Sequence, residues 1–170
     1  MKAIYLANVG NRDVKYDNEE IRPPRLYGKD YLDRFDTVRE HLAFPILQKG
    51  LTLAFQELSG KPLDFLILFY TDQNVEEVQE KFYQNDTLYF ADIIERLILL
   101  KMPNNVREMV KIKIPRTPND YDFTYEFFSE KLEELEREEK PDLVFLSPAG
   151  GIPACNMNLL ETVTKKLVNS

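Results

Sequence analysis

The strongest constraint on the fold is an apolar run from Leu63 to Tyr70, in which Asp64 is the only charged residue. A run of this length and composition is typical of a strand that is buried on both faces, as in a parallel sheet covered by helices. Three further strand-like runs lie at residues 2–8, 109–114 and 143–146. Stretches with helical spacing separate the runs, and this alternation is typical of βαβ units. The sequence therefore predicts an α/β, Rossmann-like fold with a mainly parallel central sheet and helices on both faces.

The stretches between and after these strands are predicted to be helical, apart from residues 9–36. The expected helices are residues 38–58, 75–83, 87–100, 121–139 and 152–168. Pro45 is expected to kink or restart the first of them, and Asn74 is the expected N-cap of the second. Residues 9–36 are predicted to form a polar, irregular loop, and loops of that length are usually functional or mobile.

Length and composition limit the classes of protein to be considered. The 170 residues, of which 44% are hydrophobic and 30% charged, fit one soluble domain spanning 1–170. The single cysteine, Cys155, excludes an internal disulfide and fits a cytoplasmic location. Together with the single histidine, His41, it cannot form a Cys/His zinc site, and neither a metal nor a cofactor is expected.

The net charge and the hydropathy pattern exclude two kinds of partner. The formal net charge of −7 argues against binding to duplex DNA, which proteins contact through a surplus of basic surface. The apolar runs are too short to span a membrane, so no membrane partner is expected. A small phosphorylated ligand is compatible with the negative charge, because a pocket needs only a few local donors.

Polar residues follow each of the four predicted strands. Ligands of open parallel sheets bind beyond the carboxyl ends of the strands, so we expect these residues to meet at one edge of the sheet. The candidate ligand-binding residues are Asn8, Gly10, Asn11, Arg12, Asp13, Thr71, Asp72, Gln73, Arg116, Ser147, Gly150, Gly151, Ile152 and Asn156. Their amides, hydroxyls, guanidinium groups and glycine backbone are suited to binding a phosphate and a base.

The pair Gly150-Gly151, between the last strand and the last helix, has two interpretations. Glycines at a helix N-terminus let an anion, most often a phosphate, approach bare backbone N–H groups. The pair is equally compatible with a tight turn that needs positive φ angles and no ligand. No Gly-x-Gly-x-x-Gly motif follows the first strand and no Gly-Lys-Ser/Thr motif occurs, so the dinucleotide fingerprint and the P-loop lack support.

Several single residues also have structural interpretations. Arg12 and Asp13 are compatible with an ordinary turn that contains a local salt bridge. Asp72 is compatible with a helix cap, and His41 with a surface or structural histidine. Cys155 is interpreted as a small packed residue rather than a reactive thiol.

Three segments taken together resemble the CRISPR-associated Rossmann-fold (CARF) domain family. They are Val9-Gly10-Asn11-Arg12-Asp13, Tyr70-Thr71-Asp72-Gln73 and Ser147-Pro148-Ala149-Gly150-Gly151-Ile152-Pro153. In that family the first loop and the glycine-rich last loop line a pocket on a homodimer axis. The resemblance implies that the ligand is a cyclic oligoadenylate, either tetra- or hexa-adenylate, a second messenger made by type III CRISPR complexes. The last loop of the family often reads Gly-Gly-Thr-Pro, and Ile152 in place of threonine removes one hydroxyl partner for a phosphate or ribose.

The resemblance implies a sensor domain that regulates an attached or partner effector in antiviral defence. No effector domain is expected within residues 1–170, where Leu167 to Ser170 close the last predicted helix. The HEPN ribonuclease signature, which needs an arginine five residues before a histidine, is absent because Asp36 holds that position before His41.

Two other functions remain open at this point. One is a stand-alone ring nuclease that cleaves the same messenger, with Arg12 and Arg116 stabilising charge in the transition state. The other is a nucleotide- or sugar-phosphate-handling Rossmann-like enzyme, for which Asp72 or His41 would be the acid/base group.

Overall fold

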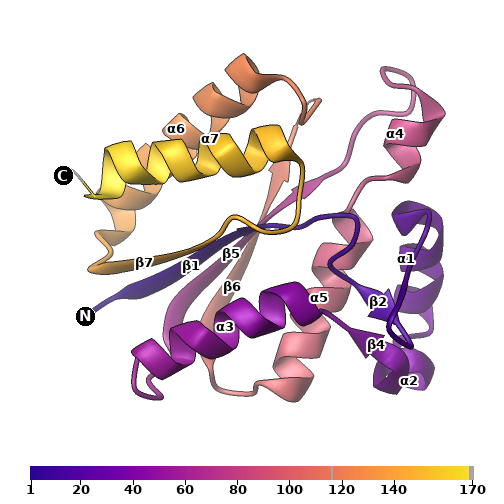
Figure 1. Ribbon diagram of the computed structural model, residues 1–170, viewed down its shortest axis with the longest axis horizontal. Helices are drawn as coiled ribbons and strands as arrows, with labels where there is room; N and C mark the ends of the chain where they lie inside the picture. The colour runs from indigo at the N-terminus through magenta and orange to yellow at the C-terminus, as the bar shows by residue number, and fades with distance from the viewer. Residues whose placement is uncertain (116, 169–170) are drawn as a thin grey trace.

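Strands and helices alternate along the computed structural model, which describes residues 1–115 and 117–168 (Figure 1). The elements in chain order are β1 (Ala3–Asn8), β2 (Lys15–Tyr16), β3 (Glu19–Glu20), α1 (Pro24–Asp33), α2 (Phe35–Val38), the 3₁₀ helix η1 (Arg39–His41), β4 (Leu42–Ala43), α3 (Pro45–Glu57), β5 (Leu63–Thr71), α4 (Glu80–Gln84), α5 (Leu88–Lys101), β6 (Val106–Ile114), α6 (Tyr121–Glu139), β7 (Leu143–Ser147), α7 (Pro153–Val163) and the π-helical segment η2 (Thr164–Val168).

The central sheet has the strand order β6-β5-β1-β7, and each neighbouring pair is parallel. Leu6 in β1, for example, pairs with Ile67 on one side and Leu146 on the other. Because all four strands run in the same direction, their carboxyl ends meet at one edge of the sheet. The predicted α/β fold with a mainly parallel sheet is confirmed.

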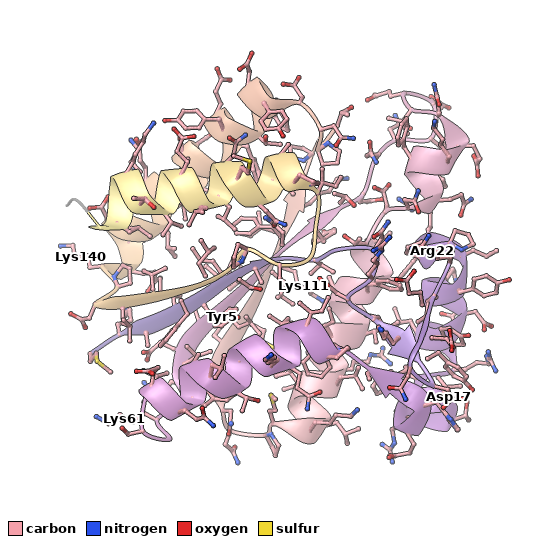
Figure 2. All side chains as sticks on the ribbon, in the orientation of Figure 1. Tyr5, Asp17, Arg22, Lys61, Lys111 and Lys140 are labelled. Atoms are coloured by element: carbon pink, nitrogen blue, oxygen red, sulfur yellow. The ribbon has the colours of Figure 1, made fainter. Side chains whose placement is uncertain are left out.

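Helices cover both faces of this sheet and form two separate cores. Side chains alternate between the faces of a strand, so Tyr5 and Ala7 of β1 enter one core while Ile4 and Leu6 enter the other. The first core packs against α3 and α5, and the second against α6 and α7. Figure 1 shows these two helix pairs on opposite sides of the strands, and Figure 2 shows Tyr5 on the side of α3.

The prediction of an irregular loop at residues 9–36 is wrong. β2 pairs with β3 and with β4 to form a small antiparallel sheet of order β3-β2-β4, and α1 lies in the chain between β3 and β4. Pro24 occupies the first turn of α1. A proline is tolerated there because the first N–H groups of a helix have no intrahelical partner, so Pro23-Pro24 marks a helix start rather than a loop.

Three predicted helix boundaries also need correction. Residues 38–58 do not form one helix; α3 begins at Pro45, so of the predicted kink or restart at this proline the structure shows the restart. The helix expected at 75–83 is reduced to α4, because Asn74 accepts a hydrogen bond from the N–H of Glu76 at 3.1 Å and forms a local turn. The last helix, expected from Ile152, begins at Pro153, and its final turns are π-helical.

None of the helices in the described part of the chain combines the length and the apolar character that a membrane-spanning segment requires.

Candidate ligand-binding site

A cavity of about 640 Å³ lies at the carboxyl ends of the strands, where the loops after β1 and β7 meet. Pockets that hold small molecules commonly measure about 300–1,000 Å³. The cavity brings together candidate residues from three of the predicted segments, namely Asn8, Gly10, Asn11, Arg12, Asp13, Thr71, Gly150, Gly151 and Ile152. The prediction that these segments meet at one edge of the sheet is confirmed for them.

The three glycines of this cavity pack the first and last loops against each other. A Cβ on Gly10 would overlap the backbone nitrogen of Gly151, and a Cβ on Gly151 would lie 2.7 Å from the Cβ of Asn8. Gly150 and Gly151 have φ angles of +83° and +67°, a conformation in which a side chain is strained. A Cβ on Gly150 would also lie 2.7 Å from Oδ1 of Asp13. Loop packing alone therefore requires these glycines, and they are not evidence for a ligand by themselves.

Two asparagine amides connect the same loops and orient each other. Asn156, on the first turn of α7, donates through Nδ2 to the carbonyl of Gly150. Its Oδ1 therefore faces Asn8, whose Nδ2 donates to it at 2.9 Å. This chain of donors leaves Oδ1 of Asn8 as a buried acceptor with no partner among the described residues. Asn156 thus positions Asn8 from behind, without lining the cavity itself.

Asp13 places a buried carboxyl group in the wall of the cavity. Its residue exposure is 3%, its Oδ2 accepts from the N–H of Gly10 at 2.7 Å, and its Oδ1 has no partner in the described part of the chain. Burial raises the pKa of the Asp13 carboxyl from 3.8 to about 6, against the lowering effect of the Gly10 hydrogen bond. The group can therefore exchange a proton close to neutral pH.

Two arginines among the described residues bring positive charge to the cavity. Arg12 comes from the turn after β1, and Arg22, labelled in Figure 2, comes from the chain just before α1. Their side chains are 64% and 55% exposed, so both guanidinium groups are accessible to a ligand. Both pair with Glu20 of β3.

The segment after β5 contributes to two neighbouring cavities. A second cavity of about 280 Å³ shares Thr71, Phe82, Asn85, Asn119 and Ile152 with the first. The predicted residue Gln73 lines only this second cavity, where its Nε2 donates to Oδ1 of Asp86 at 2.9 Å. The shared wall makes the two cavities adjacent parts of one hollow region.

Asp72, in contrast, faces an ion-pair network. It accepts from Arg25 at 2.7 Å and from Lys113 at 3.3 Å. Partial burial raises the pKa of Asp72, but the hydrogen bonds from Arg25 and Lys113 outweigh it and lower the pKa below its ordinary value. Asp72 is therefore an ionised structural partner and does not line either cavity.

Arg25 of α1 binds the segment that connects β5 to α5. Besides Asp72 it binds Asp86 at 2.8 Å and the carbonyl of Tyr83 at 2.8 Å, and its guanidinium lies 3.8 Å from the centre of the Tyr83 ring. The arginine side chain is 11% exposed and that of Asp86 is 1% exposed. These contacts hold Phe82 and Asn85 in the wall between the two cavities.

The last loop meets α7 at a helix N-terminus that has no side-chain cap. Ile152 is the N-cap and provides no side-chain capping bond, and Pro153 follows it. The first N–H groups of a helix lack intrahelical partners, so this end attracts an anion. Ser147 does not line the cavity; it is buried, and its hydroxyl lies 3.4 Å from the carbonyl of Ala149.

The remaining candidates lie outside the cavity or outside the described residues. Arg116 lies outside the described residues. His41 bonds Asp17 at 2.8 Å and stacks on Tyr16, and it does not line the cavity. Cys155 does line it, but its thiol is directed to a carbonyl 3.3 Å away, and burial raises its pKa to about 12. The thiol therefore stays neutral and unreactive, as its interpretation as a packed residue predicts.

Several lining residues were not predicted from the sequence. They are Val9, Arg22, Ile46, Phe69, Phe82, Asn85, Thr87, Ile114, Asn119, Pro153 and Cys155. Arg22 was missed because residues 9–36 were interpreted as one loop, and the usable signal was the proline pair that follows it. Phe82 and Asn85 come close only through the long-range contacts of Arg25, which leave no local sequence pattern.

Among residues 1–115 and 117–168, no group of three or more His, Cys, Asp or Glu side chains is arranged to hold a metal ion. A comparison with known protein families finds no match for the chain, and a comparison with curated proteins finds no relative.

Proposed function

We propose that the chain is a ligand-sensing domain that binds cyclic oligoadenylate across a homodimer and thereby regulates an attached or partner effector in type III CRISPR antiviral defence. One observation carries the proposal: the loop after β1 and the glycine-rich loop before α7, two of the three segments that together resemble the CARF family, enclose a single cavity. That cavity carries two exposed arginines and a helix N-terminus, which suit phosphate groups.

The lining combines the features that a nucleotide needs. Amide groups of Asn8, Asn11 and Asn85 offer donors and acceptors for a base or ribose, and Ile152 and Phe82 offer apolar contact. The net charge of the chain is −7, yet among the described residues the charged members of the lining are two arginines and the largely buried Asp13. A small anion is therefore favoured locally on a protein that repels a long polyanion.

The size of the cavity favours a site completed by a second protomer. A volume of about 640 Å³ is in the range for one drug-sized ligand, so it can hold only part of a ring of four or six nucleotides. A ring with twofold symmetry makes equivalent contacts to two protomers related by a twofold axis.

The exposed surface beside this cavity is compatible with such a dimer. On α7, Met157 and Leu160 are 63% and 48% exposed. β7 is an edge strand whose run Leu143–Leu146 is apolar and only half-buried, whereas the opposite edge strand, β6, carries Lys111 and Lys113. Charged residues on an edge strand oppose pairing with another chain, and β7 lacks them. We therefore place the dimer contact on the side of β7 and α7.

The direct test is calorimetric titration with cyclic tetra-adenylate and cyclic hexa-adenylate, with linear tetra-adenylate as the control ligand. We expect one ring per dimer and no comparable binding of the linear form. Arg12→Ala should weaken binding by about 1.5–3 kcal/mol, the range for charge-assisted hydrogen bonds, while Arg39→Ala, on an exposed pair away from the cavity, should not. Failure of both rings to bind at submillimolar concentration would refute the proposal.

A ring nuclease is a second candidate, and Asp13 is the observation that favours it. A carboxyl group with a pKa of about 6 in the cavity wall is suited to accept the proton of a ribose 2′-hydroxyl that attacks the adjacent phosphate. The P–O5′ bond breaks in that step, and the 5′ oxygen leaves as a hydroxyl with a proton from water, so the other product is a 2′,3′-cyclic phosphate. Chromatography of the nucleotide after incubation with the protein distinguishes the two functions. Linear products that form with the unmodified chain and disappear with Asp13→Asn would establish that the chain cleaves the ring. A ring that stays intact would support the sensor function and exclude the nuclease.

A further inference from the structure

The two cavity arginines share one carboxylate. Nε of Arg12 lies 3.5 Å from Oε1 of Glu20, and Nη2 of Arg22 contacts its other oxygen, Oε2. Each oxygen thus faces a different guanidinium group. Glu20 itself is not part of the cavity wall and lies beside it, on the short strand β3.

The backbone holds Glu20 in this place. In the β2–β3 pair, Glu20 is opposite Lys15 and Glu19 is opposite Tyr16. Adjacent residues of a strand point to opposite faces, so only one of the two glutamates can reach the arginines. Glu19 carries the same charge as Glu20, but it makes no ion pair within the described residues. The two residues therefore differ in their contacts and not in their charge.

This arrangement imitates the way in which arginines bind a phosphodiester. A phosphodiester presents two oxygens and a single negative charge, as a carboxylate does, and guanidinium groups pair with both anions. Glu20 cancels half of the positive charge that Arg12 and Arg22 bring. A ligand phosphate that approaches these arginines meets a carboxylate of the same sign between them.

We propose that Glu20 is an internal counter-ion that holds Arg12 and Arg22 while the cavity is free, and that an anionic ligand must displace it to bind. This inference rests on the proposed function, because it treats the cavity as an anion site. Glu20 then lowers the affinity for every anion by a similar factor, so that only ligands with further contacts in the cavity still bind appreciably. Small anions with few contacts then bind too weakly to occupy the cavity.

The proposal predicts that removing the charge of Glu20 strengthens binding. A like charge within a few ångströms of an exposed anion site changes affinity by about three- to tenfold at low salt, and salt screens the effect. Glu20→Gln should therefore bind cyclic tetra-adenylate about three- to tenfold more tightly than the unmodified chain. Inorganic pyrophosphate should gain by a similar factor.

The experiment compares the unmodified chain with Glu20→Gln and with Glu19→Gln, which removes the same charge from the adjacent position. Cyclic tetra-adenylate is titrated by calorimetry at 50 mM and 500 mM salt, and inorganic pyrophosphate is titrated by NMR with the Nε–H signals of the arginines as the readout. Thermal unfolding checks that each variant is folded. Glu20→Asp, which keeps the charge but is one methylene shorter, should give an intermediate gain.

Tighter binding by Glu20→Gln alone, with a gain that shrinks at high salt, supports the proposal. Unchanged or weaker binding overturns it, because Glu20 then only orients the arginines; an equal gain in Glu19→Gln overturns it as well, because the effect is then general. If the ring fails to bind the unmodified chain, the proposed function fails, and pyrophosphate alone decides this inference. A pyrophosphate affinity that Glu20→Gln does not raise, or no pyrophosphate binding at all, counts against it.

Discussion

Asp13 gives a pH-dependent stability that can be measured without any ligand. Its pKa of about 6 in the folded chain exceeds its ordinary value of 3.8, so the folded state binds the proton more tightly than the unfolded state. The stability that protonated Asp13 contributes is therefore fully present below pH 3.8 and is lost as the pH rises to about 6. The difference between the two values, at about 1.36 kcal/mol per pH unit, corresponds to about 3 kcal/mol in the free energy of unfolding.

The perturbation that isolates this effect is Asp13→Asn. Asparagine keeps an oxygen that can accept from the N–H of Gly10, but it cannot ionise. Its second group is a buried amide without a partner, and this costs the same free energy at every pH. The free energy of unfolding of the variant minus that of the unmodified chain should therefore rise by about 2 kcal/mol between pH 4.5 and pH 7.5, where most of the proton release occurs.

Urea denaturation at pH 4.5, 5.5, 6.5 and 7.5, followed by circular dichroism, measures this difference. Asp36→Asn serves as the control, because Asp36 carries the same charge on the exposed surface of α2. A difference that stays flat within about 0.5 kcal/mol would show that burial does not perturb Asp13, and a difference that falls with pH would show that the Gly10 hydrogen bond dominates.

Three other perturbations test separate parts of the structure. Gly151→Ala should cost clearly more stability than Gly60→Ala, since both glycines have positive φ but only the first would place its Cβ 2.7 Å from another residue; thermal unfolding gives the difference, and equal losses of about 1 kcal/mol would contradict the loop packing. Arg25→Ala should destabilise the chain by about 3–5 kcal/mol, because it leaves the buried carboxylate of Asp86 without its cation, whereas Arg39→Ala on an exposed pair should change stability by less than about 0.5 kcal/mol in the same assay. For the proposed dimer, Leu160→Glu should shift the chain to a monomer in light scattering, while Leu99→Glu, at an exposed site on α5, should not; the same behaviour in both variants would contradict the proposed contact on α7.

The sheet was predictable because its signals are local. A strand buried on both faces must be apolar throughout, and β5 carries that pattern in the sequence itself. α6 is also recovered with its predicted bounds, because Asp120 caps it with a hydrogen bond to the N–H of Phe123 and its apolar residues repeat at helical spacing. Where composition within one segment decides the structure, the sequence was sufficient.

The segments at the carboxyl-end edge of the sheet were harder to predict, because contacts with distant residues determine their conformation. Residues 72–87 have no strong pattern of their own, and Arg25 of α1 holds them through Asp72, Asp86 and Tyr83. Asn74 can either cap a helix or form a turn, and the chain adopts the turn. The candidate site was therefore predicted for most residues that directly follow β1 and β7, but not for Asp72 after β5, and it was missed where a tertiary contact carries a residue to the cavity.

The outcome for the glycines changes which residues can test the function. Gly10, Gly150 and Gly151 carry much of the CARF resemblance, yet each is already required by the contact between the first and last loops. A substitution at one of these glycines disrupts the contact between the two loops whether or not a ligand binds, so it cannot separate an effect on folding from an effect on ligand recognition. The side chains that folding does not need in full are the exposed guanidinium groups of Arg12 and Arg22, which retain most of their surface for a partner. Ligand recognition is therefore best tested at these two arginines and at Glu20, where a change in affinity can occur without a change in fold.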